Sequence, residues 1–193
     1  RRTEEGLRRS VEYFQQAIQL DPNYAAAYAG LADSYIVLAA WFYMRPNEAY
    51  PKAEAAAVKA LEIDESLPEA HSSLGVIAWE YHRDRVRADK EFQRALQLNQ
   101  GYATVHQWYA EFLSADGMHE QALAEIHRAR ELDPLSLIIN SVVGYIHYYA
   151  RRYDEAIIAC RKALELDPDF GPAHLYLSWI YLQKGMHDEA AAE

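Results

Sequence analysis

The chain has little cysteine, few cations and no long apolar run. One cysteine, Cys160, stands among 193 residues, so an internal disulfide framework is excluded and a reducing, cytoplasmic location is expected. The longest uninterrupted apolar run, 35–44, has ten residues and is too short to span a bilayer. Nineteen lysines and arginines oppose 29 acidic residues, and the net charge of −10 argues against a nucleic-acid or anionic membrane partner.

Motifs that carry catalysis are also missing from the sequence. There is no glycine-rich phosphate loop, no nucleophile elbow and no H-E-x-x-H zinc motif. The acidic pairs at 154–155 and 188–189 stand where helices are expected to begin, and a helix dipole favours acids there. We therefore expect no enzymatic activity, no bound metal and no cofactor.

One segment, Leu137 to Phe170, repeats along the chain with a period of 34 residues. Its two alanines, its leucine and its closing proline recur one period earlier. The matched positions are Ala156, Ala163, Leu166 and Pro168, then Ala122, Ala129, Leu132 and Pro134. Small residues let two helices approach closely, and the residue before a proline avoids the helical region. Each period therefore predicts a hairpin of two helices that ends at the proline.

This 34-residue pattern resembles the tetratricopeptide repeat (TPR) family. The resemblance implies an all-α fold, a right-handed α-solenoid of helix-turn-helix repeats, with four complete repeats flanked by partial ones. Each hairpin leaves an apolar face open, so the repeats must stack. We expect a single array over 1–193, made of the units 1–24 (partial), 25–67 (enlarged), 68–102, 103–136, 137–170 and 171–193 (partial).

The unit 25–67 is nine residues longer than the standard repeat. The signature positions place the extra residues between Tyr35 and Ala53, where we expect a lengthened helix and a longer turn. Pro46 suits a helix start, whereas Pro51 would have to lie in the first turn or kink the helix.

The beginning of the chain matches the second helix of a repeat. Residues 4–20 are predicted to be helical, with Thr3 as the N-cap residue. The chain starts without an apolar signal region, and we expect it to be a piece of a longer protein.

The enlarged unit and the later segment DPLSLIINSVVGYIHYYARRYDEAI are similar to the C-terminal TPR arrays of bacterial signalling proteins and transcriptional regulators. In those proteins the array follows a DNA-binding, kinase or cyclase domain. This resemblance implies a non-catalytic scaffold that serves as the regulatory arm of a larger protein.

TPR arrays line a concave groove with their first helices, and the resemblance allows the groove positions to be read by their offset in each unit. The groove residues expected to bind a partner are Asp33, Glu69, Glu80, Trp108, Glu111, Tyr145, Tyr149, Tyr176 and Trp179. An aromatic groove with an acidic rim suits a peptide or protein segment that has apolar anchors and basic flanks. The alternative is that these aromatic residues pack in the core and that the acids form a solvated face.

Self-assembly is the second function that the sequence leaves open. Both ends of the chain present an unmatched hairpin face, and the 35–51 insertion adds an apolar surface. Exposed apolar patches often mark interfaces. Trp41, Phe42 and Tyr43 are therefore candidates for contacts in a homodimer.

Three of the eight histidines share one repeat offset: His71, His106 and His174. Tyr28 and Asn140 hold the same position in other units. Neighbouring repeats could bring two of the histidines together, but no His/Cys/Asp/Glu grouping has the spacing of metal ligands. We predict a half-buried structural role for these rings.

Overall fold

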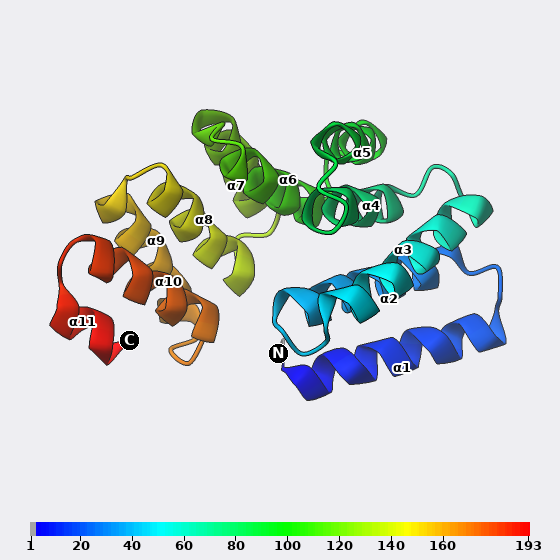
Figure 1. The fold of residues 1–193 in the computed structure, drawn as a ribbon, viewed down its shortest axis with the longest axis horizontal. Coiled ribbons are helices and arrows are strands. Elements are labelled where there is room, and N and C mark those ends of the chain that lie inside the picture. The colour runs from blue at the N-terminus through cyan, green and yellow to red at the C-terminus, as the bar shows by residue number, and fades with distance from the viewer. Residues whose placement is uncertain (1–2) are drawn as a thin grey trace. The chain divides into compact units, whose positions relative to one another are not determined.

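The computed structural model describes residues 3–193, which form eleven helices joined by short turns (Figure 1). The helices are α1 (Glu4–Leu20), α2 (Ala25–Ala40), α3 (Pro46–Ile63), α4 (Pro68–Glu80), α5 (Arg85–Leu98), α6 (Ala103–Ala115), α7 (His119–Leu132), α8 (Leu137–Tyr149), α9 (Tyr153–Leu166), α10 (Gly171–Gln183) and α11 (His187–Ala192). None of these helices is long and apolar enough to cross a membrane. The all-α prediction is confirmed.

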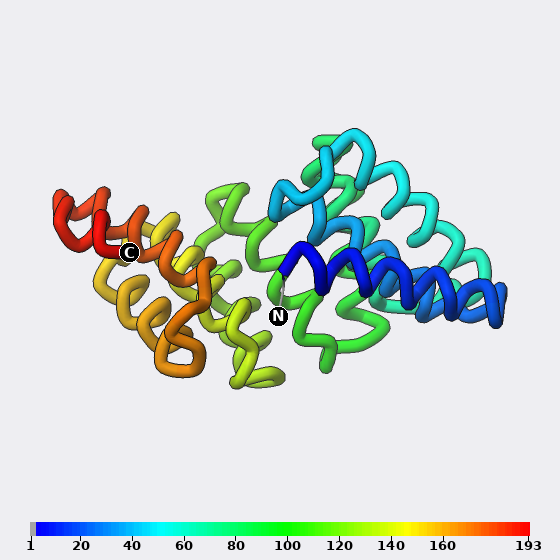
Figure 2. Tube along the Cα trace, turned by 90° about the horizontal axis from the view of Figure 1, so that it is seen from below, coloured from blue at the N-terminus to red at the C-terminus, as the bar shows by residue number. Residues whose placement is uncertain are grey.

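The chain divides into two compact units, Arg1–Gln100 with α1 to α5 and Gly101–Glu193 with α6 to α11. Within each unit, consecutive helices pack as hairpins, and first helices of successive repeats are neighbours: α2 with α4, α6 with α8, and α8 with α10. In the first unit α1 packs along α2, as two perpendicular views show (Figures 1 and 2). This repeated packing is the predicted arrangement of stacked helix hairpins.

Local sequence explains where the helices begin and end. The Thr3 hydroxyl accepts a hydrogen bond from the Gly6 amide at 3.2 Å, so the predicted N-cap of α1 is confirmed. Asp21, Asp133 and Asp167 each end a helix in an extended or near-extended conformation, with ψ between 80° and 103°. A following proline favours this conformation, so each Asp-Pro pair helps to end one helix before the next begins.

Two glycines allow the helices of a hairpin to approach closely. A Cβ atom at Gly75 would lie 2.8 Å from the Phe92 ring. At Gly144 it would overlap the Cys160 sulfur and lie 3.0 Å from the Ala156 carbonyl oxygen. These contacts join α4 to α5 and α8 to α9, which is the close packing that the small residues predicted.

The enlarged unit is longer in both helices and in the turn between them. α2 has 16 residues where α8 has 13, and α3 has 18 where α9 has 14. The 41–45 turn supplies the rest of the insertion. Pro46 begins α3 as predicted, and Pro51 lies inside the helix, one turn further along.

Candidate functional site

Aromatic side chains from neighbouring first helices meet in the second unit. Tyr145 and Tyr149 come from α8, and Tyr176 and Trp179 come from α10. The ring centroid of Tyr145 lies 4.7 Å from that of Tyr149 and 5.3 Å from that of Tyr176. The ring centroids of Tyr176 and Trp179 are 5.6 Å apart. We call these four residues the aromatic surface.

The aromatic surface is only partly buried. Tyr149 and Trp179 keep 45% and 37% of their area exposed, whereas Tyr145 and Tyr176 are half-buried beside them. Ring-to-ring contacts hold the exposed rings in place without hiding them. Large amphipathic rings fixed in this way offer contact area at little entropic cost.

Tyr148 extends the same cluster, although the repeat offsets did not predict it as a groove residue. Its ring lies 5.2 Å from Tyr149 and 6.4 Å from Trp179. The equivalent positions one repeat away are Ser114 and Leu182, so no recurring residue type marks this offset. Its contact with Trp179 depends on how α8 and α10 pack.

An acidic group stands beside the aromatic surface. Glu111 of α6 shares its repeat offset with Tyr145 and Trp179, so the three residues hold equivalent positions on neighbouring helices. Burial raises the pKa of the Tyr145 hydroxyl, and the Glu111 charge raises it further, so this hydroxyl keeps its proton. The Glu111 carboxylate also accepts a hydrogen bond from the Gln107 amide at 2.9 Å.

Trp108 belongs to the same unit but lies in the interior, with 8% of its area exposed. Its repeat offset is that of Tyr176, which is half-buried. One aromatic residue predicted for the groove is therefore buried and packs in the interior.

The acidic residues predicted for the groove in the first unit are hydrogen-bonded across neighbouring repeats or partly buried. The Ser73 hydroxyl donates to Asp33 at 2.5 Å. Glu69 is half-buried at the start of α4, and one of its carboxylate oxygens is buried without a hydrogen-bond partner. Glu80 accepts a hydrogen bond from the Tyr50 hydroxyl, and burial raises the pKa of this carboxyl although that bond opposes the effect.

The lengthened helix α3 explains why Glu80 is covered. Besides its bond to Glu80, Tyr50 stacks on Tyr81 with ring centroids 5.4 Å apart. One turn later Glu54 pairs with His82 at 2.9 Å and with Arg87 at 3.3 Å. The insertion therefore braces the turn between α4 and α5.

The insertion tip carries the residues predicted for self-association. Trp41 and Tyr43 are half-buried, whereas Phe42 is 89% exposed. Phe42 also has φ of +58°, a backbone conformation that bulky residues rarely adopt. The carbonyl of Tyr43 accepts a hydrogen bond from Arg8 at 3.1 Å, which ties the tip to α1.

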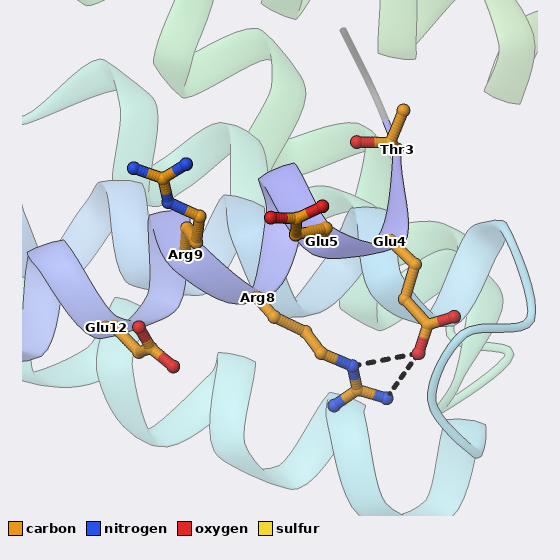
Figure 3. Close-up of a pocket in the computed structure, with 6 residues that line it drawn as sticks. All are labelled: Thr3, Glu4, Glu5, Arg8, Arg9 and Glu12. Carbon is orange, nitrogen blue, oxygen red and sulfur yellow. Dashed lines mark hydrogen bonds and ion pairs between the residues drawn. The ribbon is translucent and has the colours of Figure 1, made fainter.

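A shallow depression runs along the start of α1 (Figure 3). Its lining residues are Thr3, Glu4, Glu5, Arg8, Arg9 and Glu12. They all come from one helix end and are polar, and Arg8 pairs with Glu4 at 2.9 Å. The depression is the exposed flank of a single helix, without the convergent apolar walls of a ligand pocket.

The three offset-matched histidines are part of the hairpin framework. His71 Nδ1 lies 2.7 Å from Glu91, and His106 Nδ1 lies 2.5 Å from Glu125. Within residues 3–193 no three His, Cys, Asp or Glu side chains are grouped so that they could hold a metal ion. His71 and His174 are half-buried, as predicted, whereas His106 is buried with 7% of its area exposed.

Stacked helix hairpins with a 34-residue period define an α-solenoid class of repeat protein. Two tetratricopeptide repeat family models match residues 111–169 and 147–193. Residues 111–193 therefore carry tetratricopeptide repeats, and the first unit shares their helix-hairpin fold.

The curated relatives are longer than this chain. Transcriptional regulator HilA from Salmonella typhimurium is 28% identical over 185 residues, which cover 95% of this chain and 33% of HilA. The human protein O-mannosyl-transferase TMTC3 is 27% identical over 191 residues, which cover 95% of this chain and 19% of that protein. The chain thus spans about a third of HilA and less of TMTC3.

Solved structures share the fold at low identity. A human IFIT1 dimer with m7Gppp-AAAA matches with a TM-score of 0.82 at 20% identity, covering 96% of this chain and 45% of IFIT1. YrrB, described as a TPR protein with an unusual peptide-binding site, matches with a TM-score of 0.55 at 24% identity, covering 88% of this chain and 82% of YrrB. These likenesses establish the fold alone.

Proposed function

We propose that the chain is a non-catalytic protein-interaction scaffold and that the aromatic surface is its contact site. The observation that carries the proposal is the exposure of Tyr149 and Trp179 within a cluster of rings that fix one another. Exposed, preorganised aromatic residues are typical of the positions that dominate binding energy at interfaces. YrrB, which shares the fold, is described as having a peptide-binding site.

The partner we propose is a peptide or protein segment that presents an arginine or lysine next to an apolar residue. The apolar side chain would pack on Tyr149 and Trp179, and the cation would lie over a ring near the Glu111 carboxylate. The net charge of −10 favours approach of a basic segment and disfavours an RNA backbone. The acids of the first unit are not needed for this contact.

Fluorescence anisotropy with a library of basic, apolar peptides tests the proposal. Trp179→Ala and Tyr149→Ala should each weaken a selected peptide by about 10-fold or more, as loss of an interface hot spot does. Tyr13→Ala on α1, where the ring is 56% exposed, is the matched control and should leave the affinity unchanged. Equal affinity of all three variants would refute the site.

The electrostatic part of the proposal has its own control. Glu111→Gln should weaken a basic peptide and reduce the salt dependence of binding, because a charge beside the site is removed. Glu131→Gln on α7 removes an exposed acid that pairs with Arg128 and should have no effect. If both substitutions act alike, only the overall charge of the protein matters.

We also propose that the chain acts as the regulatory arm of a larger bacterial regulator in the cytoplasm. The similarity to HilA, named as a transcriptional regulator, supports this proposal. In the intact protein, Trp179→Ala should abolish recruitment of the partner and the regulated output while leaving protein levels unchanged. An unaltered output would contradict the regulatory role.

A second candidate is self-association through the insertion tip. The specific observation in its favour is Phe42, which is 89% exposed and held by its backbone in a strained conformation. Light scattering across a hundredfold dilution should show a dimer that dissociates, and Phe42→Ser should give the 22.2 kDa monomer at every concentration. A constant monomer in the unmodified protein would exclude this candidate.

A further inference from the structure

Two of the offset-matched histidines are held by both ring nitrogens. His71 Nδ1 lies 2.7 Å from the Glu91 carboxylate on α5, and its Nε2 lies 3.2 Å from the Glu65 carbonyl oxygen in the turn before α4. His174 repeats the arrangement: Nδ1 lies 2.5 Å from Glu193, and Nε2 lies 2.8 Å from the Pro168 carbonyl oxygen. Each ring thus joins its own hairpin to the turn that enters it. We call this arrangement a His–Glu clasp.

The two positions of the clasp vary together from repeat to repeat. Where the first position is histidine, the second is glutamate, and where it is not, the second is alanine. The pairs are His71 with Glu91, His106 with Glu125, His174 with Glu193, Asn140 with Ala159, and Tyr28 with Ala56. This matching within one chain indicates that histidine and glutamate work as a pair.

The geometry of the clasp favours a particular protonation state of the ring. A carboxylate and a carbonyl oxygen can only accept hydrogen bonds, whereas a neutral imidazole has one N–H donor. One of the two contacts at His71 would then lack its proton. The imidazolium form has two N–H donors and completes both contacts, one of them charge-assisted.

The repeat 137–170 supplies the two N–H donors from a neutral side chain. The Asn140 side-chain amide donates to the carbonyl oxygens of Pro134 and Ser136, both at 2.9 Å. Pro134 precedes Asn140 by six residues, as Glu65 precedes His71. An amide has two N–H donors at every pH, and this repeat has alanine where the histidine repeats have glutamate.

We propose that the His–Glu clasps close in their charged form, so that protonation of the histidine tightens the repeats that carry a clasp. The acid that α5 brings to the His71 ring is Glu91, and the turn before α4 brings the carbonyl of Glu65. Around His174 the acids are Glu193 and Asp169. The array thereby combines contacts that strengthen when a histidine is protonated with the contacts of Asn140, whose donors do not change with pH.

The direction of the pH effect follows from the contacts. The Pro168 carbonyl, and then Glu193, raise the pKa of His174 above its ordinary value. A raised histidine pKa contributes stability that is present below about pH 6.5 and is lost as the pH rises through the folded-state value. His127 and His147 act in the opposite sense, because burial lowers the pKa of each and protonation there costs stability. The clasps must therefore be tested one at a time.

The test replaces the histidine and glutamate of one clasp with the asparagine and alanine found in the Asn140 repeat. The double variant His174→Asn with Glu193→Ala copies Asn140 and Ala159. Its melting temperature, subtracted from that of the unmodified chain, should give a difference that shrinks by about 2–4 °C between pH 6.0 and pH 8.5. A difference that does not change with pH would overturn the proposal.

Two further measurements keep the result interpretable. His127→Asn is the matched control, because burial lowers the pKa of His127. Its melting-temperature difference should therefore change with pH in the opposite direction. Nitrogen-15 NMR of the unmodified chain reads the ring directly. His174 should keep the doubly protonated signature to higher pH than His127, whose pKa is lowered by burial, and loss of the two signatures at the same pH would also overturn the proposal.

Discussion

The close approach of α8 and α9 at Gly144 allows a quantitative prediction for Gly144→Ala. A Cβ atom there would overlap the Cys160 sulfur, which is fully buried, and would lie 3.0 Å from the Ala156 carbonyl oxygen. The carbonyl belongs to the α9 backbone, so it cannot turn away as a flexible side chain would. α8 and α9 would have to separate along their contact.

The magnitude is a balance of two terms. Overpacking a well-filled core costs about 1–3 kcal/mol, whereas replacing glycine by alanine in a helix gains at most about 1 kcal/mol of helix propensity. We expect a net loss of about 1–2 kcal/mol, which lowers the melting temperature by about 2–8 °C in a chain of this size. Urea unfolding followed by circular dichroism measures it.

Gly171→Ala is the matched control, because nothing lies within 4 Å of a Cβ atom at that position. It should be neutral or stabilise the protein by about 0.4–1 kcal/mol. In addition, Cys160→Ala should offset part of the loss at Gly144 in a double-mutant cycle, because the overlapping sulfur is removed. If Gly144→Ala is as stable as Gly171→Ala, the close-approach argument is refuted.

Three further substitutions test other parts of the structure. Asn140→Ala should cost about 1–3 kcal/mol in urea unfolding, because two buried hydrogen bonds are lost. Glu80→Gln keeps an acceptor for the Tyr50 hydroxyl. Burial raises the pKa of Glu80, so its negative charge opposes folding at any pH above the ordinary carboxyl pKa. The variant should therefore melt at a higher temperature than the unmodified chain at pH 7, and this difference should disappear towards pH 4. Trp179→Ala should change stability by less than about 1 kcal/mol, because the ring is partly exposed, while it weakens peptide binding by about 10-fold or more; calorimetry and anisotropy separate the two effects.

The fold could be predicted from the sequence because its constraints are local and recur. Thr3, Pro46 and the Asp-Pro pairs act within one turn of the chain, and a period of 34 repeats the same packing in successive hairpins. The nine-residue insertion is assigned to a lengthened helix and a longer turn for the same reason, whereas the structure divides it between both helices and the turn. Its bracing contact from Tyr50 to Glu80 could not be predicted, because that contact joins residues 30 apart through the lengths of two side chains.

The candidate site could be predicted only in part. A repeat offset places a residue on a helix face but does not fix which neighbour its side chain reaches. Trp108 and Tyr176 share an offset, yet one is 8% exposed and the other half-buried. Asp33 could be placed on the first helix of its repeat, but its hydrogen bond from Ser73 depends on how α2 and α4 pack.

The most direct test of the proposed function is to map where a selected peptide binds. Two-dimensional NMR of the chain, with a basic, apolar peptide added stepwise, should shift the signals of the aromatic surface and of Glu111 first and most strongly. The signals of α1 and of the 41–45 turn should stay in place. Shifts confined to α1 or to that turn would contradict the account and would point to the insertion tip as the functional surface.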